Sequence, residues 1–199
     1  MYIHKEEYKM AKLFMCNTSN IHEMKFGRPQ TVLNDQERPN GVIVTLGATK
    51  EAEARELDHC HGVVEGALDS VVGKFIIVAP EIIAQQYRKI DGQIGKFSLE
   101  ADETYTAYML SLYDRIEYSD AYFQGAETLA VGDKVNVIDK SANGERFAKA
   151  EEGAMRVVSI VPLWLPNVLM ANTATKQGSG ELAKLMPQSC KMIKVEVEK

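Results

Sequence analysis

The sequence contains little that would serve metal binding, covalent catalysis or membrane insertion. Its 199 residues include only three cysteines and four histidines. Cys16, Cys60 and Cys190 stand at long, irregular separations, which favours buried thiols over a disulfide framework. No apolar run approaches the roughly 20 residues that are needed to cross a bilayer. We therefore expect no membrane contact, no disulfide and no resident metal.

One short cluster does bring potential ligands and nucleophiles together. His59, Cys60 and His61 are consecutive. Neighbouring residues on a strand point to opposite faces, so at most the two histidines could share an ion, and no second pair of ligands stands at a zinc-finger-like spacing. An enzyme that uses a thiol or histidine at residues 59–61 is one alternative. The simpler interpretation is that Cys60 is a small buried hydrophobe.

Motifs of the common enzyme classes are absent from the sequence. It has no nucleophile elbow, no phosphate-binding glycine loop, no zinc-protease histidine pair and no dinucleotide-binding glycine motif. The formal net charge of -5, from 23 basic and 28 acidic side chains, argues against a protein that neutralises phosphates. We expect no enzyme activity, no catalytic residue, no cofactor and no direct nucleic-acid partner. A small β-barrel that binds nucleic acid remains an alternative, and it would need a basic groove with aromatic side chains.

What the sequence does contain is a strong β pattern in its last third. Residues 129–138 and 192–197 alternate apolar and polar side chains with a period of two, as in strands with one buried face. Between them lie a further apolar run at 154–162 and glycines at turn-like spacings. These features predict a small β-barrel-like domain over residues 126–199.

The middle of the chain predicts a second β-rich domain, over residues 41–125. Residues 41–47 and 73–80 are β-branched or apolar runs bounded by glycine or proline, which indicates strands. Pro80 and Glu81 suit the start of a short helix near residues 81–91. Aromatic residues on both sides of Asp114 and Arg115 predict a hairpin over residues 105–119. The fold class is therefore mainly β with minor helix, a barrel or sandwich core in one or two small β domains.

The first 40 residues differ from the rest in being rich in turn formers and poor in periodicity. We predict an extended N-terminal arm over residues 1–40 that buries isolated apolar side chains against another protein. Its candidate partner-binding residues are Phe14, Met15, Phe26 and Leu33. The alternative is an ordinary N-terminal strand with long loops over the protein's own core.

The single tryptophan is a further candidate contact residue. Trp164 lies between Pro162 and Pro166, and proline cannot donate to a strand ladder, so this piece is expected along an edge or in an exposed loop. An exposed Trp164 would form a contact surface. In the alternative interpretation it plugs one end of the barrel.

The order of these segments resembles that of small capsid decoration, or cement, proteins of tailed bacteriophages. The resemblance covers residues 40–199 and rests on an ordered set of segments: 40–47, 75–81, 105–119, 129–135, 156–160 and 194–197. It implies a structural virion protein, made in the host cytoplasm, that sits on the capsid surface and bridges neighbouring capsomers. The implied partner is the major capsid protein, and no catalytic residue carries over.

Physical reasoning from the segments supports the same expectation. Many weak contacts spread over several subunits raise apparent affinity without any single strong site. Self-association is also expected, with a trimer as the first guess, because small β domains gain stability from symmetric contacts. The alternative within this class is another phage head or tail assembly protein.

Overall fold

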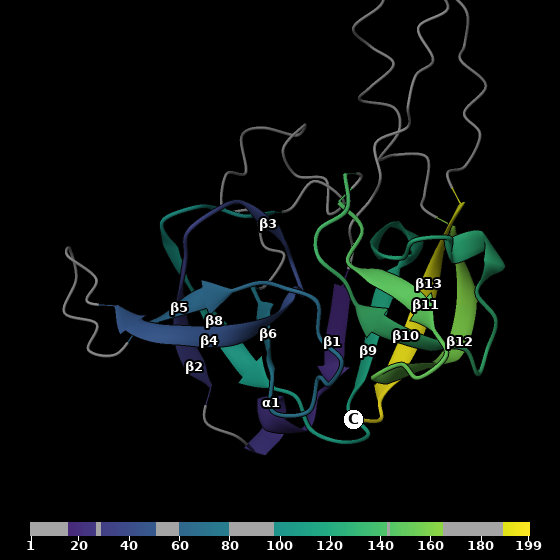
Figure 1. The fold of residues 1–199 in the computed structure, drawn as a ribbon, viewed down its shortest axis with the longest axis horizontal. Coiled ribbons are helices and arrows are strands. Elements are labelled where there is room, and N and C mark those ends of the chain that lie inside the picture. The colour runs from purple at the N-terminus through teal and green to yellow at the C-terminus, as the bar shows by residue number, and fades with distance from the viewer. Residues whose placement is uncertain (1–15, 27–28, 51–59, 80–97, 143, 165–188) are drawn as a thin grey trace, which may run out of the picture.

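The computed structural model describes residues 16–26, 29–50, 60–79, 98–142, 144–164 and 189–199 (Figure 1). Within these ranges the protein consists of thirteen strands, one short α-helix and two 3-10 helices. The prediction of a mainly β fold with minor helix and a barrel is confirmed. No helix in the described ranges has the length and apolar character that a membrane span requires.

Five strands close into a barrel, seen on the left of Figure 1. In order around the barrel they are β2 (Gln30–Asn34), β5 (Cys60–Val64), β4 (Ile43–Lys50), β6 (Phe75–Val78) and β8 (Glu103–Met109). The pair β2–β5 is parallel, whereas β8 runs antiparallel to both of its neighbours, β2 and β6. A short ribbon lies beside the barrel, formed by β3 (Arg38–Pro39) and β7 (Ser98–Leu99).

A six-stranded antiparallel sheet forms the other half of the protein, on the right of Figure 1. Its strands in order are β1 (Cys16–Asn20), β9 (Arg115–Ser119), β13 (Ser189–Val197), β12 (Met155–Trp164), β10 (Lys134–Val137) and β11 (Phe147–Ala150). Helix α1 (His22–Phe26) connects β1 to the barrel. The 3-10 helices η2 (Asp120–Tyr122) and η3 (Ala126–Thr128) follow β9.

The strands of this sheet form where the sequence alternates. In β9, Ile116 and Tyr118 are fully buried, and in β10 Val135 and Val137 are buried between less buried neighbours. One face of the sheet therefore lies against the core while the other carries polar side chains, as a period of two requires.

A shared core joins the barrel to the sheet. Ile43 and Ile76 of the barrel belong to the same buried cluster as Tyr118, Tyr122 and Phe147 from the sheet side. A second, smaller cluster fills the barrel itself and includes Val32, Val44, Ile77 and Ala107. Because the larger cluster draws on both halves, neither half buries its apolar face without the other.

Two tyrosine hydroxyls reinforce this junction. Tyr118 donates to the carbonyl of Gly41 at 2.9 Å, and Tyr122 donates to the carbonyl of Asn40. Burial raises the pKa of Tyr118 well above its ordinary value, so the hydroxyl keeps its proton and remains a donor. The backbone that leads into β4 is thus fixed from the sheet side.

The predicted N-terminal arm is wrong for the part of it that the structure describes. Residues 16–20 form β1, which pairs with β9, and residues 30–34 form β2, which is part of the barrel. Backbone pairing within the chain satisfies the donors and acceptors that an arm would have offered to a partner. The alternative of an N-terminal segment laid over its own core describes residues 16–26 and 29–40; residues 1–15, 27 and 28 lie outside the described ranges.

The predicted hairpin over residues 105–119 is also wrong. Strand β8 pairs with β2 and β6 in the barrel, whereas β9 pairs with β1 and β13 in the other sheet. The intervening residues 110–114 carry the chain from one half to the other. With β8 in the barrel and β9 in the sheet, the shared apolar core stabilises the fold more than a local pairing of the two aromatic strands would.

The predicted barrel lies in a different part of the sequence. The closed barrel is formed by strands between residues 30 and 109, and strands after residue 126 belong to the six-stranded sheet, which also takes β1 and β9. The predicted strands at 41–47, 73–80, 154–162 and 192–197 correspond to β4, β6, β12 and β13. The predicted helix near 81–91 lies outside the described residues.

Candidate protein-binding surface

The structure places the predicted contact residues in separate parts of the molecule. Phe14 and Met15 lie outside the described residues. Phe26 is the last residue of α1 and Trp164 is the last residue of β12. The structure describes the backbone of these two residues but not their side chains. Leu33 is half-buried in β2, opposite Gly62 of β5 and Thr104 of β8. Its place is a barrel strand, and its role in partner binding stays a prediction.

The edge predicted for the proline-flanked segment agrees with the described strands. Strand β12 pairs with β13 along its whole length, but with β10 only at Met155 and Arg156. Pro162 lies beyond that point, opposite Lys191 of β13. Among the described strands, this end of β12 therefore has a neighbour on one side only, where a missing N–H is tolerated.

A cluster of exposed apolar side chains lies instead at the end of β8 and on two loops beside residue 199. We call it the Tyr113 surface. Tyr113 is 74% exposed and Leu112 51% exposed, while Met109 and Val72 are each about two-fifths exposed. Exposed apolar side chains that gather on neighbouring segments are typical of contact sites. Tyrosine is also one of the residues that contribute most to interfaces.

Backbone hydrogen bonds hold these two loops together. Gly73 donates to Leu110 and Leu110 donates to Lys74, both at 2.8 Å. The amides of Val71 and Val72 both donate to the carbonyl of Lys199, which lies at the end marked C in Figure 1. The apolar side chains are therefore carried by a braced backbone, which lowers the entropic cost of binding.

The backbone of Tyr113 is in the left-handed region, with φ of +67°. For a residue with a Cβ this conformation costs about 1–2 kcal/mol. It is maintained by its surroundings, since Tyr113 N donates to Val197 O and Val197 N donates to Asp114 O, both at 2.9 Å. Strained residues of this kind concentrate at active sites, ligand clamps and switch regions.

Asp114 fixes this loop from below. Its side chain is buried and accepts two backbone N–H groups at 2.8 Å, from Ser111 in the same loop and from His22 at the start of α1. The Asp114 carboxyl group thus helps to fix the position of Leu112 and Tyr113. The sequence predicted a hairpin turn at Asp114. It did not indicate Leu112 or Tyr113 as contact residues.

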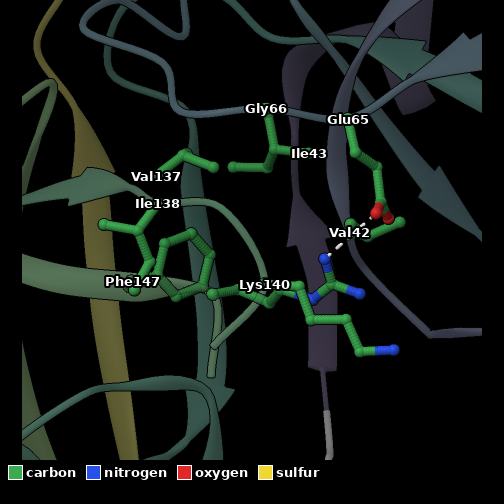
Figure 2. A pocket seen from close by; sticks show the side chains of 9 residues that line it. Val42, Ile43, Glu65, Gly66, Val137, Ile138, Lys140 and Phe147 are labelled. Atoms are coloured by element: carbon green, nitrogen blue, oxygen red, sulfur yellow. Dashed lines mark hydrogen bonds and ion pairs between the residues drawn. The ribbon is translucent and has the colours of Figure 1, made fainter. Parts of the chain in front are cut away.

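A buried ionic group joins the barrel to the sheet at another point (Figure 2). Glu65, in the loop after β5, accepts from Arg38 Nε at 2.8 Å and pairs with Arg146 Nη1 at 3.2 Å. Both arginine side chains are at least 95% buried, at 2% and 5% exposure. The group borders a small hollow in which Ile43 lies toward Val137, while Val42 lies beside the Glu65 carboxylate.

This hollow is too small for an organic ligand. Its volume is about 10 Å³, near the minimum for a single water molecule. Arg146 Nε is buried beside it without a hydrogen-bond acceptor among the described residues. The arrangement is that of a structural joint in which Glu65 pairs with two guanidinium groups, one of which also pairs with Asp35.

The thiol and histidine cluster offers no accessible nucleophile in the described part of the chain. Cys60 is fully buried in β5, and His61 is half-buried with Nδ1 3.4 Å from the carbonyl of Gly47. Burial, with a smaller contribution from Asp120, raises the pKa of the Cys190 thiol and so disfavours the reactive thiolate. No group of three metal ligands occurs among the described residues. His59 lies outside them.

The outer face of the six-stranded sheet carries a network of ion pairs. Glu196 of β13 accepts from Arg115 at 2.7 Å and from Arg156 at 2.9 Å, and Lys194 pairs with Glu117 at 2.6 Å. Hydrogen bonds from Arg115 and then Arg156 lower the pKa of Glu196 from its ordinary value. Charges of both signs are thus interspersed along this face.

We expect Glu196→Gln to lower the free energy of unfolding at neutral pH. We also expect that free energy to fall less steeply in the variant as the pH is lowered. A lowered carboxyl pKa stabilises the fold above the unfolded-state value of about 4.3, and this contribution is lost as the pH falls through the folded-state pKa. Because both arginines are about half exposed, the loss at neutral pH should be only about 1 kcal/mol. Urea unfolding at neutral and acidic pH measures both effects. Glu151→Gln, at an exposed turn, is the control; equal acid sensitivity in all three proteins would contradict the assignment.

Comparison with protein-family models, with curated proteins and with solved structures finds no match to this chain. The functional argument therefore rests on the chain's own residues. Of the surfaces described, the Tyr113 surface combines exposure, aromatic character and a braced backbone. It is the strongest candidate for contact with another molecule.

Proposed function

We propose that the protein is a structural virion protein that binds the outer surface of a phage capsid and stabilises contacts between capsomers. The major capsid protein is the proposed partner, and self-association as a trimer is part of the proposal. The order of β segments in the sequence supports this function. The observation that carries it is the Tyr113 surface, a group of exposed apolar side chains on a backbone held in a strained conformation.

The two-part architecture is suited to such a role. A barrel and a sheet joined by one apolar core and by the Glu65 ion pairs form a single rigid platform. A rigid platform binds with little loss of conformational entropy, so little of the binding energy is spent on ordering. Several copies on adjacent capsomers would add their contacts, so modest individual affinities suffice.

The test is cosedimentation of the purified chain with expanded capsids of the major capsid protein encoded in the same genome. We expect the unsubstituted chain to bind at saturable copy number and Tyr113→Gly to bind about 30-fold more weakly, the usual loss for an interface residue worth about 2 kcal/mol. Val131→Ser changes a valine that is 64% exposed, against 74% for Tyr113, on a different loop; it is the matched control, with unchanged binding expected.

Stability separates a binding effect from a folding effect. Glycine relieves the left-handed backbone at position 113, a gain of about 1–2 kcal/mol that its greater freedom in the unfolded chain offsets by about 0.5–1 kcal/mol. The Tm of Tyr113→Gly should therefore equal or slightly exceed that of the parent. Absence of the chain from sedimented capsids at every concentration would overturn the proposed function. Equal binding by Tyr113→Gly would remove the Tyr113 surface from it.

A further inference from the structure

We propose that Glu23 and Asp114 form a proton-binding pair that controls how firmly residues 111–114, and with them the Tyr113 surface, are held. The pair connects two elements far apart in sequence, the first turn of α1 and the loop between β8 and β9. The proton is the ligand, and its binding at Glu23 stabilises the closed loop. This inference concerns the isolated chain and goes beyond the proposed function.

The geometry begins with Asp114. Its two carboxylate oxygens are each used, Oδ1 by the amide of His22 and Oδ2 by the amide of Ser111. These two bonds tie one side chain to the backbone of two elements. The Asp114 carboxyl group is therefore part of what holds α1 against the loop.

Glu23 places a second carboxyl group in the same region. It is the residue after His22, and its Oε2 is buried without a hydrogen-bond donor among the described residues. An ionised oxygen in that position lacks both water and a donor, which is unfavourable. Burial raises the pKa of Glu23, and the charge of Asp114 raises it further. A protonated Glu23 removes the repulsion and gains a donor.

The other titratable groups nearby do not replace this pair. His22 lies on the same helix and is exposed to solvent. Strand β8, which contacts α1, contributes Tyr108, a neutral side chain that is partly buried against the core. Arg115 follows Asp114 directly, but its guanidinium pairs with Glu196 on the outer face of the sheet. Asp114 is the charged neighbour that acts on Glu23.

The direction of the pH effect follows from these contacts. A carboxyl whose folded-state pKa is raised contributes most to stability when it is protonated, and that contribution is lost as the pH rises through the folded-state value. Deprotonation of Glu23 therefore loosens the attachment of α1 to the loop at Asp114. The Tyr113 surface should be more firmly ordered in mild acid than at neutral pH.

Hydrogen exchange of the full-length chain tests this directly. We compare protection factors, which correct for the pH dependence of intrinsic exchange, for the amides of His22 and Ser111. In the parent protein they should fall several-fold as Glu23 deprotonates, and in Glu23→Gln they should stay at the high value found in mild acid. Glu127→Gln, at an exposed position of η3, is the control and should behave like the parent.

A second measurement needs no substitution. Carbon-13 NMR titration of the glutamate carboxyl groups should give Glu23 a midpoint above that of exposed glutamates. A midpoint at or below theirs would overturn the proposal, as would identical pH-dependent protection in the parent and in Glu23→Gln. Neither experiment involves a capsid, so the proposed function can fail while this inference stands, and the reverse.

Discussion

Replacing Glu65 with alanine is expected to lower the free energy of unfolding by about 3–5 kcal/mol, because removing one member of a buried ionic group leaves the others uncompensated. Arg146 loses the carboxylate it pairs with at 3.2 Å, and Arg38 loses an acceptor at 2.8 Å. Arg38 keeps Asp35 at 2.7 Å, so the larger penalty falls on Arg146. For a protein of this size the change corresponds to a fall in Tm of roughly 6–20 °C, which calorimetry measures.

The matched control for Glu65→Ala is Lys149→Ala. Lys149 pairs with Asp133 at 2.7 Å, a distance comparable to those at Glu65, but its side chain is 53% exposed. Exposed pairs contribute little, so its Tm should hardly change. Glu65→Gln keeps the shape and should lie between the two. Equal small effects in Glu65→Ala and Lys149→Ala would show that the joint is not neutralised as described.

Gly41→Ala is expected to have the second large effect, a loss of about 2–5 kcal/mol from backbone strain and overpacking together. Gly41 has φ of +81°, and a Cβ there would lie 2.3 Å from Cys16 Sγ and 2.7 Å from Cys16 Cβ. Strand β1 would have to move away from the barrel, and the Tyr118 bond to Gly41 O would be disturbed. Chemical unfolding measures the loss.

Gly73→Ala separates the two causes. Gly73 has a similar φ of +76°, but a Cβ there meets nothing within 4 Å. It should lose only the backbone contribution, about 1–2 kcal/mol. Cys16→Ala in the Gly41→Ala background removes the nearer clash and should restore part of the stability. A Gly41→Ala protein no less stable than Gly73→Ala would contradict the close approach of β1 to the barrel.

The strands that sequence analysis located are those whose burial alternates. In β9, β10 and β13 one face lies against the core and the other carries charges, so the period of two is visible in the residues themselves. Strands β4 and β6 were visible as β-branched or apolar runs. In these cases local pattern and tertiary environment agree.

The N-terminal strands were missed because their sequence carries no such pattern. Strand β1 is Cys16–Asn20, four of whose five residues are polar, and it exists because β9 offers it a ladder. Strand β2 becomes a barrel element through a parallel pairing with β5, a contact between distant parts of the sequence. In both strands the tertiary contacts outweigh the local preference of these residues for turns.

The candidate site could not be predicted from the sequence, because it too depends on contacts between residues that are far apart in the chain. Glu65 lies 27 residues from Arg38 and 81 from Arg146, so only the fold brings them together. Tyr113 is an aromatic residue in a conformation that usually takes glycine or asparagine, and nothing in its identity indicates that. The one local signal was Asp114, since aspartate often binds backbone amides in turns.

The order of strands in the six-stranded sheet bears on how the chain reaches its native state. Strand β1 precedes the barrel in sequence, β9 follows it, and β13, which lies between β9 and β12, ends at residue 197. During synthesis the barrel strands can associate before β13, one of the two neighbours of β9, has been made. Completion of the sheet requires long-range loop closure, which slows folding. In a nascent chain one edge of β9 would thus lack its ladder partner until β13 has been synthesised.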